Sequence, residues 1–154
     1  LISPADVRDV ITGIEERGVF GEIDVVLSGY QGSEGIGDVI LDAVARVKAA
    51  NPAAVYSCDP VMGNAKSGCF VAPAIPILLR ERVVPAADII TPNQFELEFL
   101  TGREVRSMED ALAAAAAARA LTTHDAWSPP TTPRVVPAPR VAPDPEPAPD
   151  EEPY

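Results

Sequence analysis

The sequence predicts an α/β domain with a parallel β-sheet and helices on both faces of that sheet. Short apolar segments rich in β-branched residues alternate with longer segments whose apolar residues recur at helical spacing. Strands that alternate with helices form right-handed βαβ units, which build a parallel sheet. The strand segments have few polar positions, which is typical of strands covered on both sides.

The first part of the chain contains two predicted helices with a strand between them. Ser3, followed by a proline, marks a helix start, and Gly18 marks the end of that helix. Residues 23–27 follow as a buried strand. A helix with apolar residues over 36–47 must end at Asn51, because the proline after it disfavours helical geometry in the preceding residue.

The second part continues the same alternation. The predicted elements are a strand over 55–58, a Gly-, Asn- and Ser-rich loop over 63–68, a helix over 74–83, a strand over 88–91, a helix from Asn93 to Gly102, and a helix that begins at Ser107 and runs through the alanines at 113–118.

The C-terminal segment differs in composition from the rest. Ten of the 17 prolines follow Trp127, and residues 128–154 show no apolar periodicity. Such a segment cannot bury enough apolar surface to offset the entropy lost on ordering it. We therefore expect one domain over residues 1–121 and a disordered Pro-rich tail over residues 122–154.

Composition also disfavours several classes of function. The formal net charge is -11, which disfavours contact with the phosphate backbone of a nucleic acid. The chain has no signal segment and no apolar run of about 18 residues, so we expect no membrane association. Only Cys58 and Cys69 are present, without metal-like spacing, and a cytoplasmic location is the simplest expectation.

Two polar motifs follow predicted strands, at the edge where open parallel sheets bind ligands. Asp59 comes directly after the strand 55–58, where a fixed carboxylate suits Mg²⁺ or a Mg²⁺-bound phosphate. Asn93 and Glu96 begin a helix after the strand 88–91, and its free N–H groups suit a hydrated metal and phosphates. Each motif also has a purely structural interpretation, as an Asp-Pro turn and as a capping box.

Together the two motifs resemble those of a known family. The segments Asp59-Pro60-Val61-Met62-Gly63 and Thr91-Pro92-Asn93-Gln94-Phe95-Glu96 are similar to those of the vitamin kinases of the ribokinase-like superfamily. Cys58, the stretch Gly68-Cys69-Phe70-Val71-Ala72-Pro73 and the loop Ser28-Gly29-Tyr30 are most similar to pyridoxal kinases. The resemblance covers about residues 1–106, which correspond to the interior of the family's chain. We therefore expect a partial ribokinase-like domain.

The resemblance implies an ATP-dependent kinase that phosphorylates the 5′-hydroxyl group of pyridoxal to give pyridoxal 5′-phosphate. It assigns ATP binding to Asp59, Thr91 and Glu96, and Mg²⁺ binding to Asp59 and Glu96. It places Tyr30 at the border of the pyridoxal pocket, with a tyrosine that merely caps the sheet edge as the alternative. The implied cofactors are ATP and Mg²⁺, and the implied assembly is a homodimer.

The catalytic base that the family uses to accept the proton of the substrate hydroxyl has no counterpart in this sequence. The family places an aspartate in a late Gly-x-Gly-Asp turn, and no such turn follows Glu96. Gly35-Ile36-Gly37-Asp38 has the right letters, but it precedes Asp59 and lies at a helix start, so we interpret Asp38 as a solvated acid of the first turn. We assign no catalytic residue and expect little or no kinase activity from the 154-residue chain.

Two alternatives stay open. Hydroxymethylpyrimidine kinases share the Asp-Pro-Val-Met strand end and the Asn-x-x-Glu helix start, so a kinase of that kind is the nearest enzymatic alternative. The abrupt change of composition near Leu121 also fits a non-catalytic product of truncation or of a frameshift.

Overall fold

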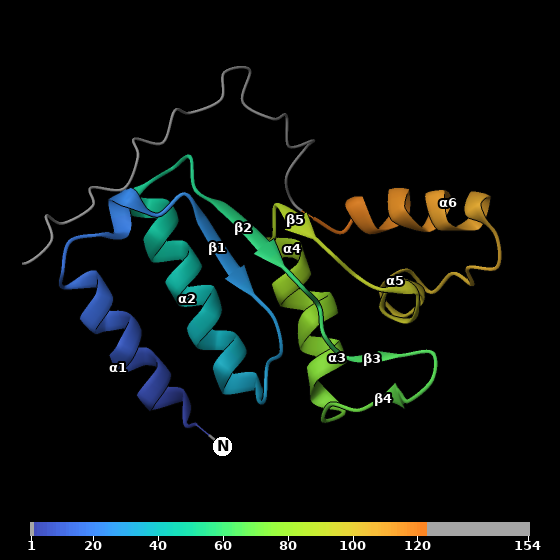
Figure 1. Cartoon of the computed structure of the whole chain (residues 1–154), viewed down its shortest axis with the longest axis horizontal. Coiled ribbons are helices and arrows are strands. Elements are labelled where there is room, and N and C mark those ends of the chain that lie inside the picture. Colours follow the sequence, from blue (N-terminus) through green and yellow to red (C-terminus); the bar gives the residue numbers. More distant parts are fainter. Residues whose placement is uncertain (1, 123–154) are drawn as a thin grey trace, which may run out of the picture.

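Residues 2–122 are described by a computed structural model of the chain. Three parallel strands, β1 (Val25–Ser28), β2 (Val55–Cys58) and β5 (Ile89–Ile90), form a sheet in the order β1-β2-β5. Val25 lies opposite Val55 and Cys58 lies opposite Ile90. Figure 1 shows the three strands side by side, with α1 and α2 beyond β1 and with α5 and α6 beyond β5. The expected α/β class with a parallel sheet is confirmed.

The helices begin and end close to the predicted signals. Serine side chains cap α1 (Pro4–Glu15), α2 (Glu34–Ala50) and α6 (Met108–Arg119), and each accepts a hydrogen bond from a backbone N–H of the first turn. The helix α5 (Gln94–Thr101) ends at Gly102, whose φ of 68° is left-handed. These boundaries were predictable because each depends on residues close together in the sequence.

The helix predicted over 74–83 is longer and less regular than expected. It consists of α3 (Ala74–Leu78), a π-helical turn η2 (Leu79–Val83) and α4 (Val84–Ala86) in direct succession. Pro85 has no N–H with which to continue the ordinary helical hydrogen bonds, and a widened turn accommodates that interruption.

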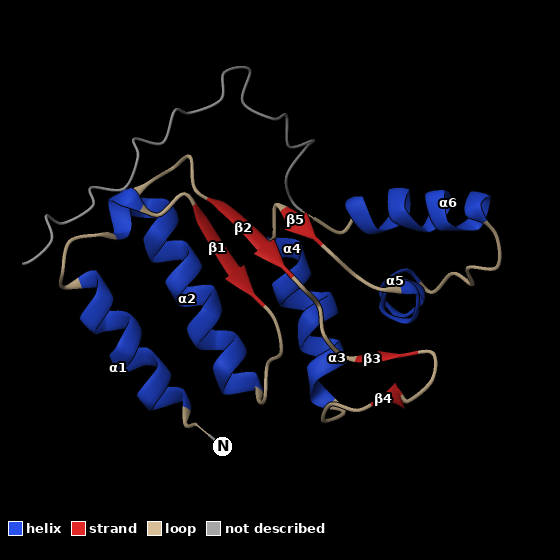
Figure 2. Cartoon of the chain, viewed as in Figure 1, coloured by secondary structure: helices blue, strands red, loops and turns tan. Residues whose placement is uncertain are grey.

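Two short elements differ from the sequence expectation. The segment expected to be a loop contains a two-stranded antiparallel hairpin, β3 (Gly63–Asn64) and β4 (Gly68–Cys69). A 3₁₀ turn, η1 (Phe20–Glu22), precedes β1. The strands β3 and β4 have two residues each and show no alternation of apolar and polar side chains, so sequence periodicity could not reveal these two strands. Figure 2 shows the hairpin apart from the parallel sheet, beside α3.

The core lies on one face of the sheet. Tyr56 and Cys58 are fully buried there, among apolar residues of α2 and of the helical segment 74–86. The opposite face carries Val25 and Leu27, whose side chains are 57% and 74% exposed. Within the described residues, β1 is therefore covered on one side only, whereas its apolar sequence indicates a strand covered on both.

The short strand β5 is attached through the residue that precedes it. The backbone N–H of Asp88 donates to the carbonyl of Tyr56 at 2.9 Å, and the carboxylate of Asp88 accepts from the backbone N–H of Tyr56 at 2.7 Å. The same carboxylate pairs with Lys48 of α2 at 2.6 Å. One residue thus joins β2, β5 and α2.

The expected disordered tail lies outside the described residues, apart from residue 122. The helices of the described part include none that is both long and apolar enough to cross a membrane.

Candidate nucleotide and metal site

The site is built on two neighbouring strand ends. The backbone N–H of Asp59 donates to the carbonyl of Ser28 at 2.9 Å, and that of Thr91 donates to the carbonyl of Cys58 at 3.1 Å. The parallel hydrogen bonding thus continues one residue beyond β2 and β5. Asp59 and Thr91 therefore lie next to each other at the carboxyl edge of the sheet, where such sheets bind ligands.

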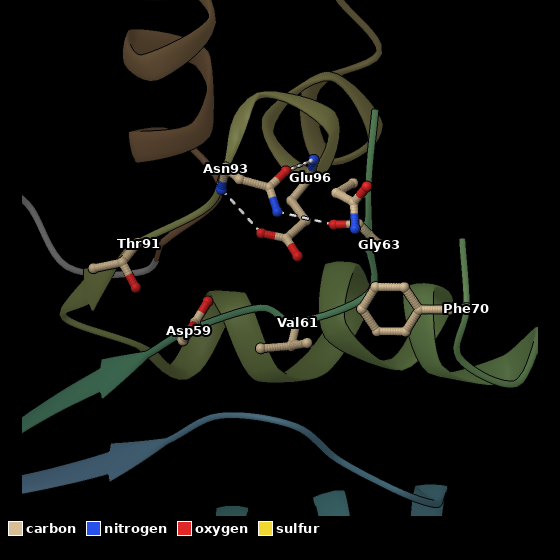
Figure 3. Close-up of a pocket in the computed structure, with 8 residues that line it drawn as sticks. Asp59, Val61, Gly63, Phe70, Thr91, Asn93 and Glu96 are labelled. Atoms are coloured by element: carbon tan, nitrogen blue, oxygen red, sulfur yellow. Dashed lines mark hydrogen bonds between the residues drawn. The ribbon is translucent and has the colours of Figure 1, made fainter. Parts of the chain in front are cut away.

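A pocket of about 300 Å³ opens at this edge. Figure 3 shows Asp59 and Thr91 at one end of it, Val61 and Phe70 toward the other, and Glu96 between them from the opposite side. The residues that line it come from two strand ends, the hairpin and the start of α5: Asp59, Val61, Gly63, Asn64, Phe70, Thr91, Asn93 and Glu96. The three residues predicted to bind ATP and metal are thus brought together.

Glu96 is 2% exposed and holds two segments of backbone. Its Oε1 accepts from the N–H of Met62 at 3.0 Å, and its Oε2 accepts from the N–H of Asn93 at 2.9 Å. The Oδ1 of Asn93 accepts from the N–H of Glu96 at 3.1 Å in return. The structural interpretation of this motif, a capping box at the start of α5, is therefore confirmed. The same box lines the pocket, so capping and ligand binding are compatible.

The electrostatics of the pocket favour a cation. Burial, together with the neighbouring negative charge of Glu96, raises the pKa of Asp59 above its ordinary value. A positive charge beside Asp59 would lower that pKa and stabilise the ionised form of Asp59.

The donor set indicates which cation fits. The side-chain oxygens that line the pocket belong to two carboxylates, one hydroxyl and two amides. Residues 2–122 contain no group of three or more His, Cys, Asp or Glu that could hold a metal ion. Mg²⁺ commonly binds proteins through one or two carboxylates and completes its shell with water and substrate phosphates. The pocket therefore fits a hydrated Mg²⁺ that arrives with phosphate groups.

The layer beneath Asp59 is buried and uncharged. The hydroxyls of Ser28 and Tyr56 form a hydrogen bond of 2.8 Å. Burial raises the pKa of the Tyr56 hydroxyl and of the Cys58 thiol. The Cys58 thiol therefore stays protonated at neutral pH, which supports its interpretation as a structural residue with no nucleophilic role.

Two other sequence candidates lie away from the pocket. Tyr30 follows β1, is 63% exposed and is not one of the residues that line the pocket described above. Asp38 pairs with Arg82 at 2.7 Å on the surface, in accord with a solvated acid of the first helical turn. The adjacent Gly37 serves packing, because a Cβ there would lie 2.5 Å from Cδ2 of Leu78.

The hairpin contributes residues that sequence reasoning missed. Phe70 is 53% exposed at the pocket, and its N–H donates to the carbonyl of Met62 at 3.1 Å. A sequence signal for the hairpin did exist. The Oδ1 of Asn64 accepts from the N–H groups of Lys66 and Ser67, both at 2.9 Å, and this use of asparagine is typical of turns.

A parallel α/β sheet with carboxylates, a hydroxyl and a helix N-terminus at its carboxyl edge defines an α/β protein whose candidate site has the chemistry that suits phosphates and a metal ion. Comparison with known proteins then identifies the family. The model of the phosphomethylpyrimidine kinase family matches residues 21–126, and the chain belongs to that family.

Among curated proteins, the chain is similar to pyridoxal kinases, as its motifs suggested. It is 74% identical over 121 residues to pyridoxal kinase PdxY of Leifsonia xyli, which covers 79% of this chain and 43% of the relative. It is 66% identical over 119 residues to the PdxY of Corynebacterium diphtheriae, which covers 77% of this chain and 42% of the relative. The chain thus spans less than half the length of these relatives.

Solved structures show the same likeness. The pyridoxal kinase of Leishmania donovani in complex with ADP and pyridoxamine has a TM-score of 0.71 and 26% identity, over 78% of this chain and 42% of that chain. The pyridoxal kinase of Entamoeba histolytica has a TM-score of 0.67 and 28% identity, over 74% of this chain and 40% of that chain. The resemblance to pyridoxal kinases is therefore confirmed in both sequence and fold.

Proposed function

We propose that this chain carries the ATP- and metal-binding corner of a pyridoxal kinase, an enzyme that transfers the γ-phosphoryl group of ATP to the 5′-hydroxyl of pyridoxal. One observation carries the proposal: Asp59, Thr91 and Glu96 line a single pocket at the carboxyl edge of the sheet. The similar pyridoxal kinase of L. donovani, which is in complex with ADP and pyridoxamine, supports the proposal that this pocket belongs to a nucleotide site.

The residues of the pocket then have distinct roles. Asp59 and Glu96 would hold Mg²⁺, Glu96 through water because its oxygens already accept backbone N–H groups. Bound Mg²⁺ supplies positive charge that neutralises the phosphate oxygens during transfer. The Thr91 hydroxyl would donate to a phosphate oxygen, and the first turn of α5 would add the positive end of its dipole.

Pyridoxal is the phosphoryl acceptor, and we propose that Tyr30 borders its ring. Tyr30 lies in the loop directly after β1, at the same sheet edge as Asp59, and its exposed ring is free to pack against a planar ligand. We further propose a cytoplasmic location and, for the whole protein, a homodimer.

Titration of the 154-residue chain with ATP and MgCl₂ by calorimetry tests the proposed site. Asp59→Asn is expected to weaken binding at least on the order of tenfold, because it removes the fixed charge that holds the metal. The matched control is Asp38→Asn, which removes an exposed carboxylate that pairs with Arg82 outside the pocket. Equal affinities of Asp59→Asn and the unsubstituted chain would refute the site.

A second assay separates identity from activity. We propose that the 154-residue chain binds Mg·ATP without transferring the phosphoryl group, because it offers no Gly-x-Gly-Asp turn after Glu96. Formation of pyridoxal 5′-phosphate by the purified chain, followed by absorbance, would contradict this proposal. In a longer protein that contains these residues, competition between pyridoxal and hydroxymethylpyrimidine decides the substrate, and preferential phosphorylation of the pyrimidine would exclude pyridoxal kinase.

A further inference from the structure

Asn93 lines the pocket, yet its side chain is already engaged by the protein. Its Nδ2 donates to the carbonyl of Gly63 at 2.9 Å, and its Oδ1 accepts from the N–H of Glu96 at 3.1 Å. The first bond reaches across to the hairpin, whereas the second stays within the start of α5. A residue that only caps a helix needs the second bond and not the first.

The bond to Gly63 lies beside a second connection between the same two segments. The N–H of Met62, the residue before Gly63, donates to Oε1 of Glu96 at 3.0 Å. Two consecutive residues of the loop that begins at Asp59 are thus tied to one turn of α5. Figure 3 shows the bond from Asn93 to Gly63 on the side of the pocket opposite Asp59. The two bonds connect the segment that follows Asp59 to the helix that carries Glu96.

We propose that Asn93 is a positioning residue that clamps the loop 59–63 to α5, and not a residue that contacts the ligand. This inference rests on the proposed function, in which Asp59 and Glu96 act together on a metal-bound polyphosphate. Two carboxylates can share one hydrated cation only when their separation is held, and a supporting hydrogen bond holds it better than solvent does. Asn93 provides that support with its amide N–H, which an aspartate, serine or threonine cap lacks.

Substitutions at Asn93 separate the clamp from the cap. Asn93→Ser keeps an oxygen that can cap α5 but has no group that reaches Gly63, whereas Asn93→Ala loses both functions. Ser107→Ala is the matched control, since Ser107 caps α6 and does not line the pocket. We expect Asn93→Ser and Asn93→Ala each to weaken Mg·ATP binding on the order of tenfold, with Ser107→Ala unchanged. Wild-type affinity in Asn93→Ser would show that Asn93 is only a cap and would overturn the proposal.

Hydrogen exchange provides a test that needs no ligand. The N–H of Met62 is bonded to Glu96 and that of Phe70 to the carbonyl of Met62, so both report on the clamped segment. Asn93→Ser is expected to speed exchange at these two amides, and Ser107→Ala is not. Unchanged exchange in Asn93→Ser would overturn the clamp. If the unsubstituted chain does not bind Mg·ATP, the proposed function fails, and the exchange rates still decide the role of Asn93 in holding the loop.

Discussion

Substitution of Gly63 by alanine tests how tightly the hairpin is packed against the site. A Cβ on Gly63 would lie 2.3 Å from the carbonyl oxygen of Gly68 and 2.6 Å from Cε1 of Phe95. The first contact is with backbone, so no side-chain rotation can relieve it. The second is with a ring of α5, the helix that also supplies Glu96. Gly63→Ala must therefore separate β3 from β4, from α5, or from both.

Overpacking of this kind costs about 1–3 kcal/mol of unfolding free energy, and we expect the upper part of that range because a backbone atom must move. Urea denaturation of the 154-residue chain, followed by circular dichroism, measures this cost as a lower midpoint. Gly13→Ala is the control. A Cβ at Gly13 meets nothing within 4 Å, and alanine at this position in the last turn of α1 should raise the unfolding free energy by up to about 1 kcal/mol.

The same variant should also lose affinity for Mg·ATP, because the displaced Gly63 carbonyl can no longer accept from Asn93. A Gly63→Ala chain as stable as the unsubstituted protein, with unchanged nucleotide affinity, would refute the close packing of the hairpin against α5.

Three further predictions concern the sheet and its edge. Tyr56→Phe removes the buried hydroxyl bonded to Ser28 and should cost about 1 kcal/mol in a urea titration; a stability equal to that of the unsubstituted chain would contradict the bond. Lys48→Met removes the ion pair with the carboxylate of Asp88, whose side chain is 12% exposed, and should lower the unfolding free energy by about 1–3 kcal/mol. Lys66→Met, in the exposed turn, should not lower it. The raised pKa of Asp59 means that the folded chain holds this proton more tightly than the unfolded chain does. The protonated Asp59 therefore contributes its full stabilisation below the ordinary pKa of aspartate, and this stabilisation is lost as the pH rises through the raised pKa. Asp59→Asn should remove this part of the pH dependence of the unfolding free energy. Mg·ATP affinity should fall as the pH is lowered through the same interval, and a flat profile would exclude Asp59 as the cation ligand.

Much of the fold could be predicted because its determinants are local. A serine cap, a left-handed glycine or a proline acts within one helical turn, so Ser3, Gly102 and Ser107 marked their boundaries in the sequence. The presence of Asp59 and Glu96 in one pocket was also predictable, because parallel strands end at a common edge.

The hairpin and its contribution to the site were harder to predict. Two-residue strands carry no periodic signal, and the placement of Phe70 at the pocket depends on contacts between Gly63, Gly68 and Phe95. Those contacts are set by packing between segments distant in the sequence. The exposure of Leu27 could not be predicted for a related reason. An apolar strand sequence indicates that other residues pack on both faces of the strand, but it does not indicate which residues these are.

Asp88 fixes the register of β5, which the two residues of that strand could not fix alone. β5 has two residues, too few to select a pairing partner through their own backbone groups. The Asp88 carboxylate takes the place of a main-chain carbonyl opposite Tyr56, and Lys48 recognises the same oxygen. If β5 slipped by one residue, Ala87 or Ile89 would occupy this position, and neither side chain can accept a hydrogen bond. The register of β5 against β2 is therefore fixed by one side chain, that of Asp88. This register also places Thr91 beside Asp59.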